Sequence, residues 1–339
     1  MRLVRTLVTM IAVVFSIWAA SAIWIDGPLS VWILAPILGG FLVTSVGLFL
    51  VVKRRIPSLI PNQPYSLFAI FAGGVPSLCV LVWWLNIPAS NDRDWIDEVE
   101  RPPRVEIIGD RLRIENVRNF DYRTGEDYTP RWETREYDLS QLRGVDLFLS
   151  TWGSPLIAHT IASWDFGDDQ HLAISIETRK EIGEEYSAVL GFFRQYELYY
   201  VVADERDVVR VRTNFRGEDV RLYHLETKPA VAREILLDYI KEINQLTLEP
   251  TWYNALTHNC TTNIRHHVQH VAPSGGLMDW RVLVNGRLDE LGYERGNVDT
   301  SLPFETLRET SRISERAKIA PTDSSFTAWI REGLPGEHD

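Results

Sequence analysis

The chain has 339 residues, of which 45% are hydrophobic, and its formal net charge at pH 7 is -11. Such an acidic balance argues against a nucleic-acid-binding protein, because a polyanion would be repelled. With only two cysteines, the chain is also not a small scaffold held by several disulfides. The length leaves room for one membrane unit and one globular domain of ordinary size.

Three apolar stretches in the first ninety residues predict a transmembrane bundle over residues 1–90. Each approaches or exceeds the roughly 20 residues that cross a hydrocarbon core of about 30 Å. The stretches are residues 6–25, 29–52 and 67–87. Two arginines precede the first stretch, and this arrangement also fits a cleaved signal peptide, which is the alternative interpretation.

The basic residues beside these stretches predict the orientation of the bundle. Arg2 and Arg5 precede the first stretch and residues 53–55 separate the second from the third, whereas the first loop holds only Asp26. The positive-inside rule then places the N-terminus in the cytoplasm and the rest of the chain in the periplasm, as a multi-pass protein of the inner membrane. The first ninety residues hold five basic groups and one acidic group, which leaves 30 basic and 45 acidic groups for the outer domain.

The remainder of the chain predicts an α+β domain with an antiparallel sheet over residues 105–339. Residues 91–104 are polar, end in two prolines before Arg104, and are expected to form a linker. Short alternating runs then follow, and helical periodicity appears at residues 231–246 and from Asn259 to just before Pro273. Strands first and helices late are typical of α+β architecture. The strand candidates include VDLFLSTW, HTIASWDF, HLAISIE, QYELYYVVA, VVRVRT and VRLYHL.

Cys260 is the candidate nucleophile of this domain. It is the sole thiol outside the bundle, since Cys79 lies in the third apolar stretch. If Asn259 caps the following helix, Cys260 falls in the first turn, where free N–H groups and the helix dipole favour a thiolate. The same N–H groups would stabilise an oxyanion beside the sulfur. A cysteine that only packs in the core is the competing interpretation.

His159 is the candidate base, because it opens the strand HTIASWDF. If residues 167–169 form a three-residue hairpin loop, the register places His159 opposite Glu177 on the next strand. A carboxylate beside an imidazole fixes its tautomer and stabilises the imidazolium, which is the third role in a catalytic triad. A shift of this register would bring in Asp165 or His171 instead.

Histidines on the last predicted helix raise the question of a metal. His266, His267 and His270, with His258 nearby, have spacings that place imidazoles on one helix face. Neither an HExxH nor a CxxC motif accompanies them. We therefore expect a solvated helix face, with no metal and no other cofactor.

Three segments of the outer domain resemble a bacterial family, the Lnb N-terminal periplasmic domain family, which is a domain of unknown function. The resemblance covers roughly residues 110–320. Its segments are HTIASWDFGDDQHLAISIETRK, GFFRQYELYYVVADERDVVRVRTN and YNALTHNCTTNIR. The order of histidine before an Asn-Cys helix start is also similar to the permuted NlpC-type papain-like proteins, which include lecithin:retinol acyltransferase. That resemblance implies a papain-like fold with His159 as base, Glu177 as its partner and Cys260 as nucleophile; glutamate departs from the histidine, asparagine or glutamine that is usual at this place.

Together these features predict a membrane-anchored periplasmic cysteine hydrolase, peptidase or acyltransferase. Its substrate would be an amide or ester of the envelope, in cell-wall peptide, lipoprotein or lipid. The alternative is a non-catalytic binding or folding-assistance module tethered to the inner membrane. A further alternative is that the apolar stretches serve to dock a partner protein.

Overall fold

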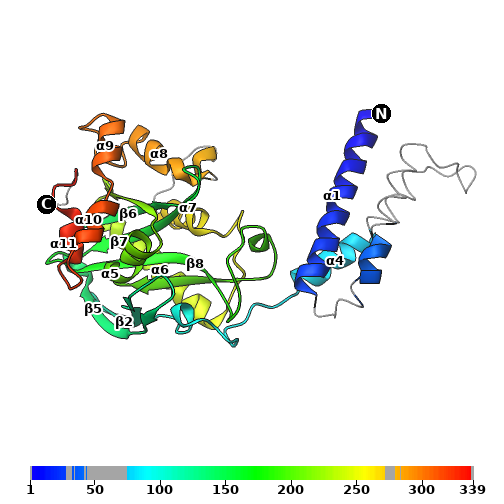
Figure 1. The fold of residues 1–339 in the computed structure, drawn as a ribbon, viewed down its shortest axis with the longest axis horizontal. Coiled ribbons are helices and arrows are strands. Elements are labelled where there is room, and N and C mark those ends of the chain that lie inside the picture. The colour runs from blue at the N-terminus through cyan, green and yellow to red at the C-terminus, as the bar shows by residue number, and fades with distance from the viewer. Residues whose placement is uncertain are drawn as a thin grey trace, which may run out of the picture. The chain divides into compact units, whose positions relative to one another are not determined.

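The computed structural model of the chain describes residues 2–27, 33, 35–41, 43, 75–271, 279–282 and 284–336. The chain divides into two compact units (Figure 1). One comprises Met1–Ala89 and Ser187–Gln195, and the other comprises Ser90–Tyr186 and Tyr196–Asp339.

The first unit holds two described helices, α1 (Arg2–Asp26) and α4 (Val75–Leu85). Ala19 and Ala22 of α1 are fully buried in one apolar cluster with Val80 of α4 and Phe193. The two small side chains permit this close approach of helices. The carboxylate of Asp26 accepts hydrogen bonds from the Trp84 indole at 2.7 Å and from the backbone N–H of Arg194 at 3.1 Å, which joins the segment around Arg194 to α1.

The prediction of a transmembrane bundle is corrected by the structure. Within residues 2–27, 33, 35–41, 43, 75–271, 279–282 and 284–336, no helix is at once long enough and apolar enough to cross a membrane. Most of the expected span 29–52, and residues 67–74 of the third, lie outside the described residues. The described part of the chain therefore does not support the bundle, the membrane anchor or the multi-pass topology.

The second unit is built on one large sheet with strand order β1-β2-β9-β8-β7-β6-β10, to which β5 adds by pairing with β2. All its pairings are antiparallel except that of β2 with β9, which is parallel at Arg118 and Ala203. The domain is therefore α+β as expected, but its sheet is mixed and the expectation of a purely antiparallel sheet was wrong. The strands of the sheet are β1 (Arg104–Ile108), β2 (Arg111–Arg118), β5 (Trp132–Asp138), β6 (Gly144–Thr151), β7 (Ala158–Asp165), β8 (His171–Arg179), β9 (Glu197–Ala203) and β10 (Asp219–His224); β3 (Asp121–Tyr122) and β4 (Tyr128–Thr129) form a separate hairpin.

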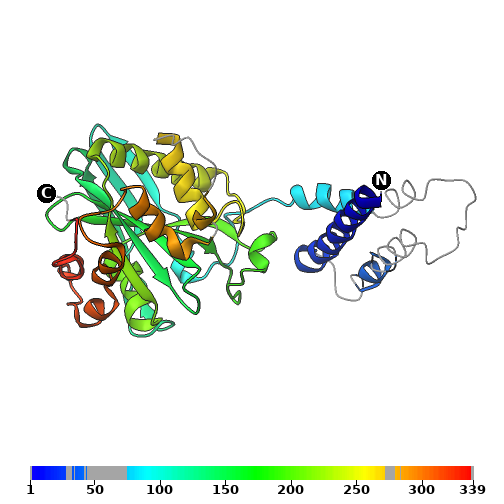
Figure 2. The same ribbon diagram turned by 90° about the horizontal axis from the view of Figure 1, so that it is seen from above.

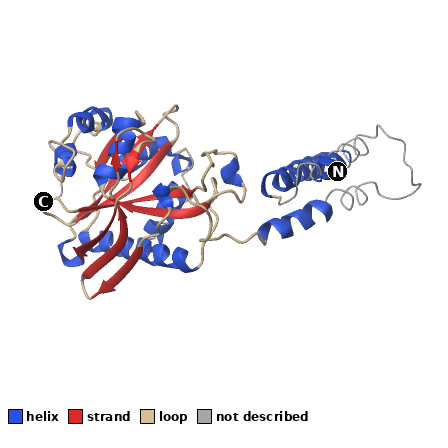
Figure 3. Ribbon diagram, turned by 60° about the horizontal axis from the view of Figure 1, so that its bottom comes forward, coloured by secondary structure: helices blue, strands red, loops and turns tan. Residues whose placement is uncertain are grey.

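Helices cover both faces of this sheet, as Figure 3 shows, and every residue of the central strand β7 is buried. In Figure 2 the C-terminal helices, in red, lie on one side of the strands and the yellow helices on the other. Phe326 and Ile330 pack with Ile161 of β7 on the first face, while the Trp164 indole donates to the carbonyl of Ala232 on the second. The helices are α5 (Glu205–Val208), α6 (Pro229–Leu248), α7 (Cys260–Val271), α8 (Leu288–Glu294), α9 (Phe304–Thr310), α10 (Ser314–Ile319) and α11 (Phe326–Arg331).

One expected strand, VVRVRT, is absent from the sheet. Its residues instead end α5 and begin a short π-helix, Val211–Phe215. The alternation of apolar and polar residues predicts a strand, but Val208, Val209 and Val211 are all buried, which a helical turn also permits. The change of conformation turns Arg212 toward the sheet, where it meets Glu177.

Candidate active site

Helix α7 begins at Cys260, and a reciprocal pair of capping bonds defines this start. The Asn259 side chain accepts from the backbone N–H of Thr262 at 2.9 Å, while the Thr262 hydroxyl accepts from the backbone N–H of Asn259 at 2.9 Å. This arrangement is a capping box, with threonine in place of the usual glutamate. Cys260 is half-buried and lies in the first turn, where the helix dipole favours a negative sulfur.

His159 and Glu177 meet at the end of the β7–β8 hairpin. The Nε2 atom of His159 lies 3.1 Å from Oε1 of Glu177 and 2.6 Å from the hydroxyl of Ser175. Ser175 also donates to Oε1 of Glu177 at 2.6 Å, so the three side chains form one small network. The hairpin loop sets this register. The backbone N–H of Phe166 donates to the carbonyl of Gln170, and the strands then pair without a shift from Asp165 and His171 to Ile161 and Ser175.

The sulfur of Cys260 and the imidazole of His159 shift each other's titration. Burial raises the pKa of Cys260, but a hydrogen bond from His159 and the charge of its ring bring that pKa down to about 6. Burial lowers the pKa of His159, but the charge of Glu177 and hydrogen bonds to Cys260 and Glu177 raise it to about 9. Because Nε2 already bonds Ser175 and Glu177, the other ring nitrogen is the one left for the thiol.

Glu177 is itself held ionised by an arginine that the sequence did not single out. Burial raises its pKa, but the charges of His159 and Arg212 hold that pKa well below the usual range. Arg212 donates to Oε1 of Glu177 at 2.7 Å and to Glu218 at 3.2 Å, and Ser150 donates to the same oxygen of Glu218. The charges thus run from Cys260 through His159 and Glu177 to Arg212 and Glu218.

Ser175 and Arg212 were missed for different reasons. Ser175 stands two residues before Glu177 on the same strand, so the period of two along a strand places both on one face and was a usable signal. Arg212 belongs to the segment expected as a strand, and only the tertiary fold brings it to Glu177.

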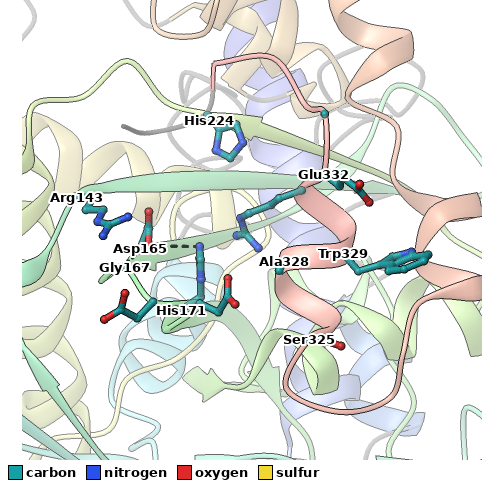
Figure 4. Close-up of a pocket in the computed structure, with 13 residues that line it drawn as sticks. Arg143, Asp165, Gly167, His171, His224, Ser325, Ala328, Trp329 and Glu332 are labelled. Carbon is teal, nitrogen blue, oxygen red and sulfur yellow. Dashed lines mark hydrogen bonds and ion pairs between the residues drawn. The ribbon is translucent and has the colours of Figure 1, made fainter.

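The alternative residues Asp165 and His171 lie at the opposite end of β7. They pair directly across the hairpin, and Nε2 of His171 is 3.7 Å from Oδ1 of Asp165. Figure 4 shows both at a cavity of about 550 Å³, with His224 and Arg143 among its other walls. Asp165 lies six positions after His159 on the same strand, which is roughly 20 Å at about 3.3 Å per residue. This cavity therefore does not serve the thiol.

The histidines of α7 make bonds that differ from the expected solvated face. His267 is buried, its Nδ1 lies 2.6 Å from Asp238 and its Nε2 lies 2.8 Å from the hydroxyl of Tyr200. His270 also approaches the same carboxylate of Asp238, at 3.2 Å. Across the described part of the chain, no group of three histidine, cysteine, aspartate or glutamate side chains has the arrangement of a metal site.

Comparison with known proteins gives one match. The family model of the Lnb N-terminal periplasmic domain matches residues 128–286, a stretch that includes His159, Glu177 and Cys260. No curated protein and no solved structure matches the chain, and the resemblance to permuted NlpC-type papain-like proteins stays unconfirmed. Residues 128–286 thus match the Lnb N-terminal periplasmic domain family, and this match supports a periplasmic location.

Proposed function

We propose that the periplasmic domain is a thiol hydrolase or acyltransferase in which Cys260 is the nucleophile, His159 the base and Glu177 the residue that holds the imidazolium. The substrate is an amide or ester of the cell envelope. Binding without catalysis, the other function considered for this domain, is the outcome that the experiments below would reveal.

The observation that carries this proposal is the geometry: a thiol in the first turn of α7 lies beside an imidazole that the Glu177 carboxylate holds at 3.1 Å. The pKa shifts of the two groups support it. The pKa of Cys260 is about 6 and that of His159 is about 9. Between these values the pair exists as thiolate and imidazolium, which is the reactive form of a Cys–His site. A cysteine that only packs in a core has no reason to be ionised at neutral pH.

The chemistry follows from the two charges. The thiolate attacks the carbonyl carbon, a carbon–sulfur bond forms, and the free N–H groups at the start of α7 support the negative oxygen. The tetrahedral intermediate collapses to a thioester as the imidazolium of His159 protonates the departing amine or alcohol. Water or a second acceptor then gives its proton to the neutral imidazole and attacks the thioester, which releases the acyl group and restores the thiolate.

The loops around this site favour a substrate with an apolar part. Trp152, Leu156 and Ile157 are exposed on the loop that leads into β7, two to seven residues before His159. Leu256 is exposed in the turn before α7, four residues from Cys260. Exposed apolar side chains on the loops that lead to the base and to the nucleophile favour a binding surface there. These side chains favour lipoprotein and lipid, which carry acyl chains, over cell-wall peptide as the substrate.

The test is acylation of the full-length protein by p-nitrophenyl octanoate. We expect release of p-nitrophenol together with an octanoyl adduct on Cys260, located by mass spectrometry of its peptide. The Cys260→Ser variant, which keeps the shape of the side chain, should give no such adduct. Alkylation by iodoacetamide is measured in parallel as a function of pH. If the parent forms no adduct and shows no reactive thiol below pH 7.5, the domain binds without catalysis.

A further inference from the structure

A short turn late in the chain closes against the segment that leads into β7. Asn285, in the 3-10 turn Asn285–Arg287, is buried, and its Oδ1 accepts from the backbone N–H of Ala158 at 2.7 Å. Its Nδ2 donates to the backbone carbonyl of the same residue and to the hydroxyl of Thr261 at 2.5 Å. One amide therefore satisfies both backbone groups of a strand residue and one side chain of a helix.

The two residues that this amide joins are the neighbours of the proposed catalytic pair. Ala158 directly precedes His159, and Thr261 directly follows Cys260. Thr261 is also buried, so its hydroxyl has little access to water as a substitute partner. Asn285 thus links the start of the strand that carries the base to the start of the helix that carries the nucleophile.

Gly286 supports the same contact independently. Its backbone N–H donates to the carbonyl of Leu156 at 3.0 Å. A Cβ atom at this position would lie 2.1 Å from the carbonyl oxygen of Pro155, which is far inside contact distance. The turn lies directly against residues 155–158 because this position lacks a side chain.

We propose that Asn285 is a positioning residue, which fixes the separation of the Cys260 sulfur and the His159 ring by bonding Ala158 and Thr261 at once. This inference rests on the proposed Cys–His function. A thiol and an imidazole exchange a proton only at hydrogen-bond distance, and a shift of about 1 Å is enough to cost much of the rate.

The test measures how the alkylation of Cys260 by iodoacetamide depends on pH in the full-length protein. The parent should show a midpoint near pH 6, set by the thiolate. Asn285→Ala and Thr261→Val each remove one end of the link, and both should move the midpoint upward by about one pH unit or more, toward an ordinary cysteine. Thr261→Ser keeps the hydroxyl and should behave as the parent does. Because the two residues act through one bond, the double variant Asn285→Ala, Thr261→Val should shift the midpoint by less than the sum of the two single shifts.

A matched control separates positioning from general loosening. Asn244 of α6 makes the same kind of link to β1: its Oδ1 accepts from the N–H of Val105 at 3.1 Å and its Nδ2 donates to the carbonyl of Val105 at 2.9 Å. Asn244→Ala should lower the melting temperature as Asn285→Ala does, yet leave the alkylation midpoint where it is in the parent.

The outcomes distinguish this inference from the proposed function. A parent midpoint in the range of ordinary cysteines would remove the proposed function itself. A parent midpoint near pH 6 that stays unchanged in Asn285→Ala and Thr261→Val would overturn the positioning role alone. If Asn285→Ala does not fold, Asn285→Ser decides, since its shorter side chain cannot bond both segments at once. Thr261→Val alone would not decide, because it also removes the contact of the Thr261 hydroxyl with the Cys260 sulfur at 3.8 Å.

Discussion

Strand β7 carries a buried charged cluster at each of its ends, and the two clusters use the same kinds of residue. At the start of the strand His159 lies with Glu177 and Arg212, and at its end His171 lies near Asp146 and Arg331. At the first end, burial lowers the pKa of His159 but Glu177 outweighs it, and the ring is protonated at neutral pH.

At the other end burial lowers the pKa of His171 and the charge of Arg331 lowers it further, against the opposing effect of the nearby carboxylates. Arg331 is bonded there to both Asp146 and Glu205 at 2.6–2.9 Å, so these carboxylates are already occupied. A histidine among buried charges is thus not in itself a catalytic signal. What distinguishes the first end is a carboxylate aimed at the ring and a thiol at a helix start.

Replacing the two histidines should show the largest contrast. We expect His159→Ala to slow acylation of Cys260 by roughly 10²–10⁴-fold, the usual contribution of a general acid–base group. His171→Ala should leave the rate of the folded protein within about twofold of the parent, because its partner Asp165 lies roughly 20 Å along β7 from His159. The measurement is the p-nitrophenol release rate at pH 7.5. Equal losses in both variants would show that the two ends are not functionally different.

Replacing the two arginines should separate stability from chemistry. Arg212→Met and Arg331→Met each leave a buried carboxylate without its arginine partner. Each substitution should therefore lower the free energy of unfolding by about 3–5 kcal/mol, as measured by urea titration. At equal folded fraction, only Arg212→Met should also raise the alkylation midpoint of Cys260, because only Arg212 holds the partner of His159. If the thiol titrates identically in both variants, Arg212 does not act on Cys260 through Glu177 and His159.

Glu177→Gln should have a smaller effect than His159→Ala. The amide keeps the shape and an acceptor oxygen but loses the charge that raises the pKa of His159. Each unit by which that pKa falls removes about 1.4 kcal/mol of support for the imidazolium, or about tenfold. We expect the upper limb of the pH–rate profile, near pH 9 in the parent, to move downward. If the upper limb of the pH–rate profile does not move, it reports the titration of a group other than His159.

The smallest expected effect is on the pH dependence of stability, where the two ends should have opposite signs. The pKa of His159 is raised in the folded state, so its contribution is complete below the ordinary value and is lost as the pH rises toward 9. The pKa of His171 is lowered, so the unfolded chain binds a proton that the folded chain does not, and stability falls as the pH drops below about 6.5.

Urea midpoints between pH 5 and 10 measure both slopes, in a Cys260→Ser background that removes the titration of the thiol. His171→Gln should flatten the acid side and His159→Gln the alkaline side. Slopes that do not respond to these substitutions would show that other groups control the stability.

Local sequence was sufficient for the hairpin that brings His159 toward Glu177. The loop Gly167–Asp168–Asp169 has positive φ at all three residues, which glycine and aspartate tolerate better than most, and its length sets the register of both strands. The cap at Asn259 was predictable for the same reason, since its partners lie within three residues. Arg212 was not predictable, because its conformation and its partner both depend on the packed sheet.

The prediction for the first ninety residues failed on a different point. Composition says how apolar a stretch is, but it does not say where a helix begins and ends or what it packs on. The described helix α1 buries Ala19 and Ala22 against α4, and a hydropathy count does not distinguish such a contact from exposure to lipid. The parallel pairing of β2 with β9 was missed because it joins segments far apart in the chain, for which no turn motif exists.

The wide separation of the site residues along the chain also determines when the thiol becomes reactive. Cys260 owes its low pKa to His159, about a hundred residues earlier, so an unfolded chain carries an ordinary thiol that is largely protonated at neutral pH. In the periplasm, where a thiolate is exposed to oxidants and to other disulfides, this delay is protective. If Cys260 is the nucleophile, as proposed, folding itself activates it, and any loss of the native fold switches it off again.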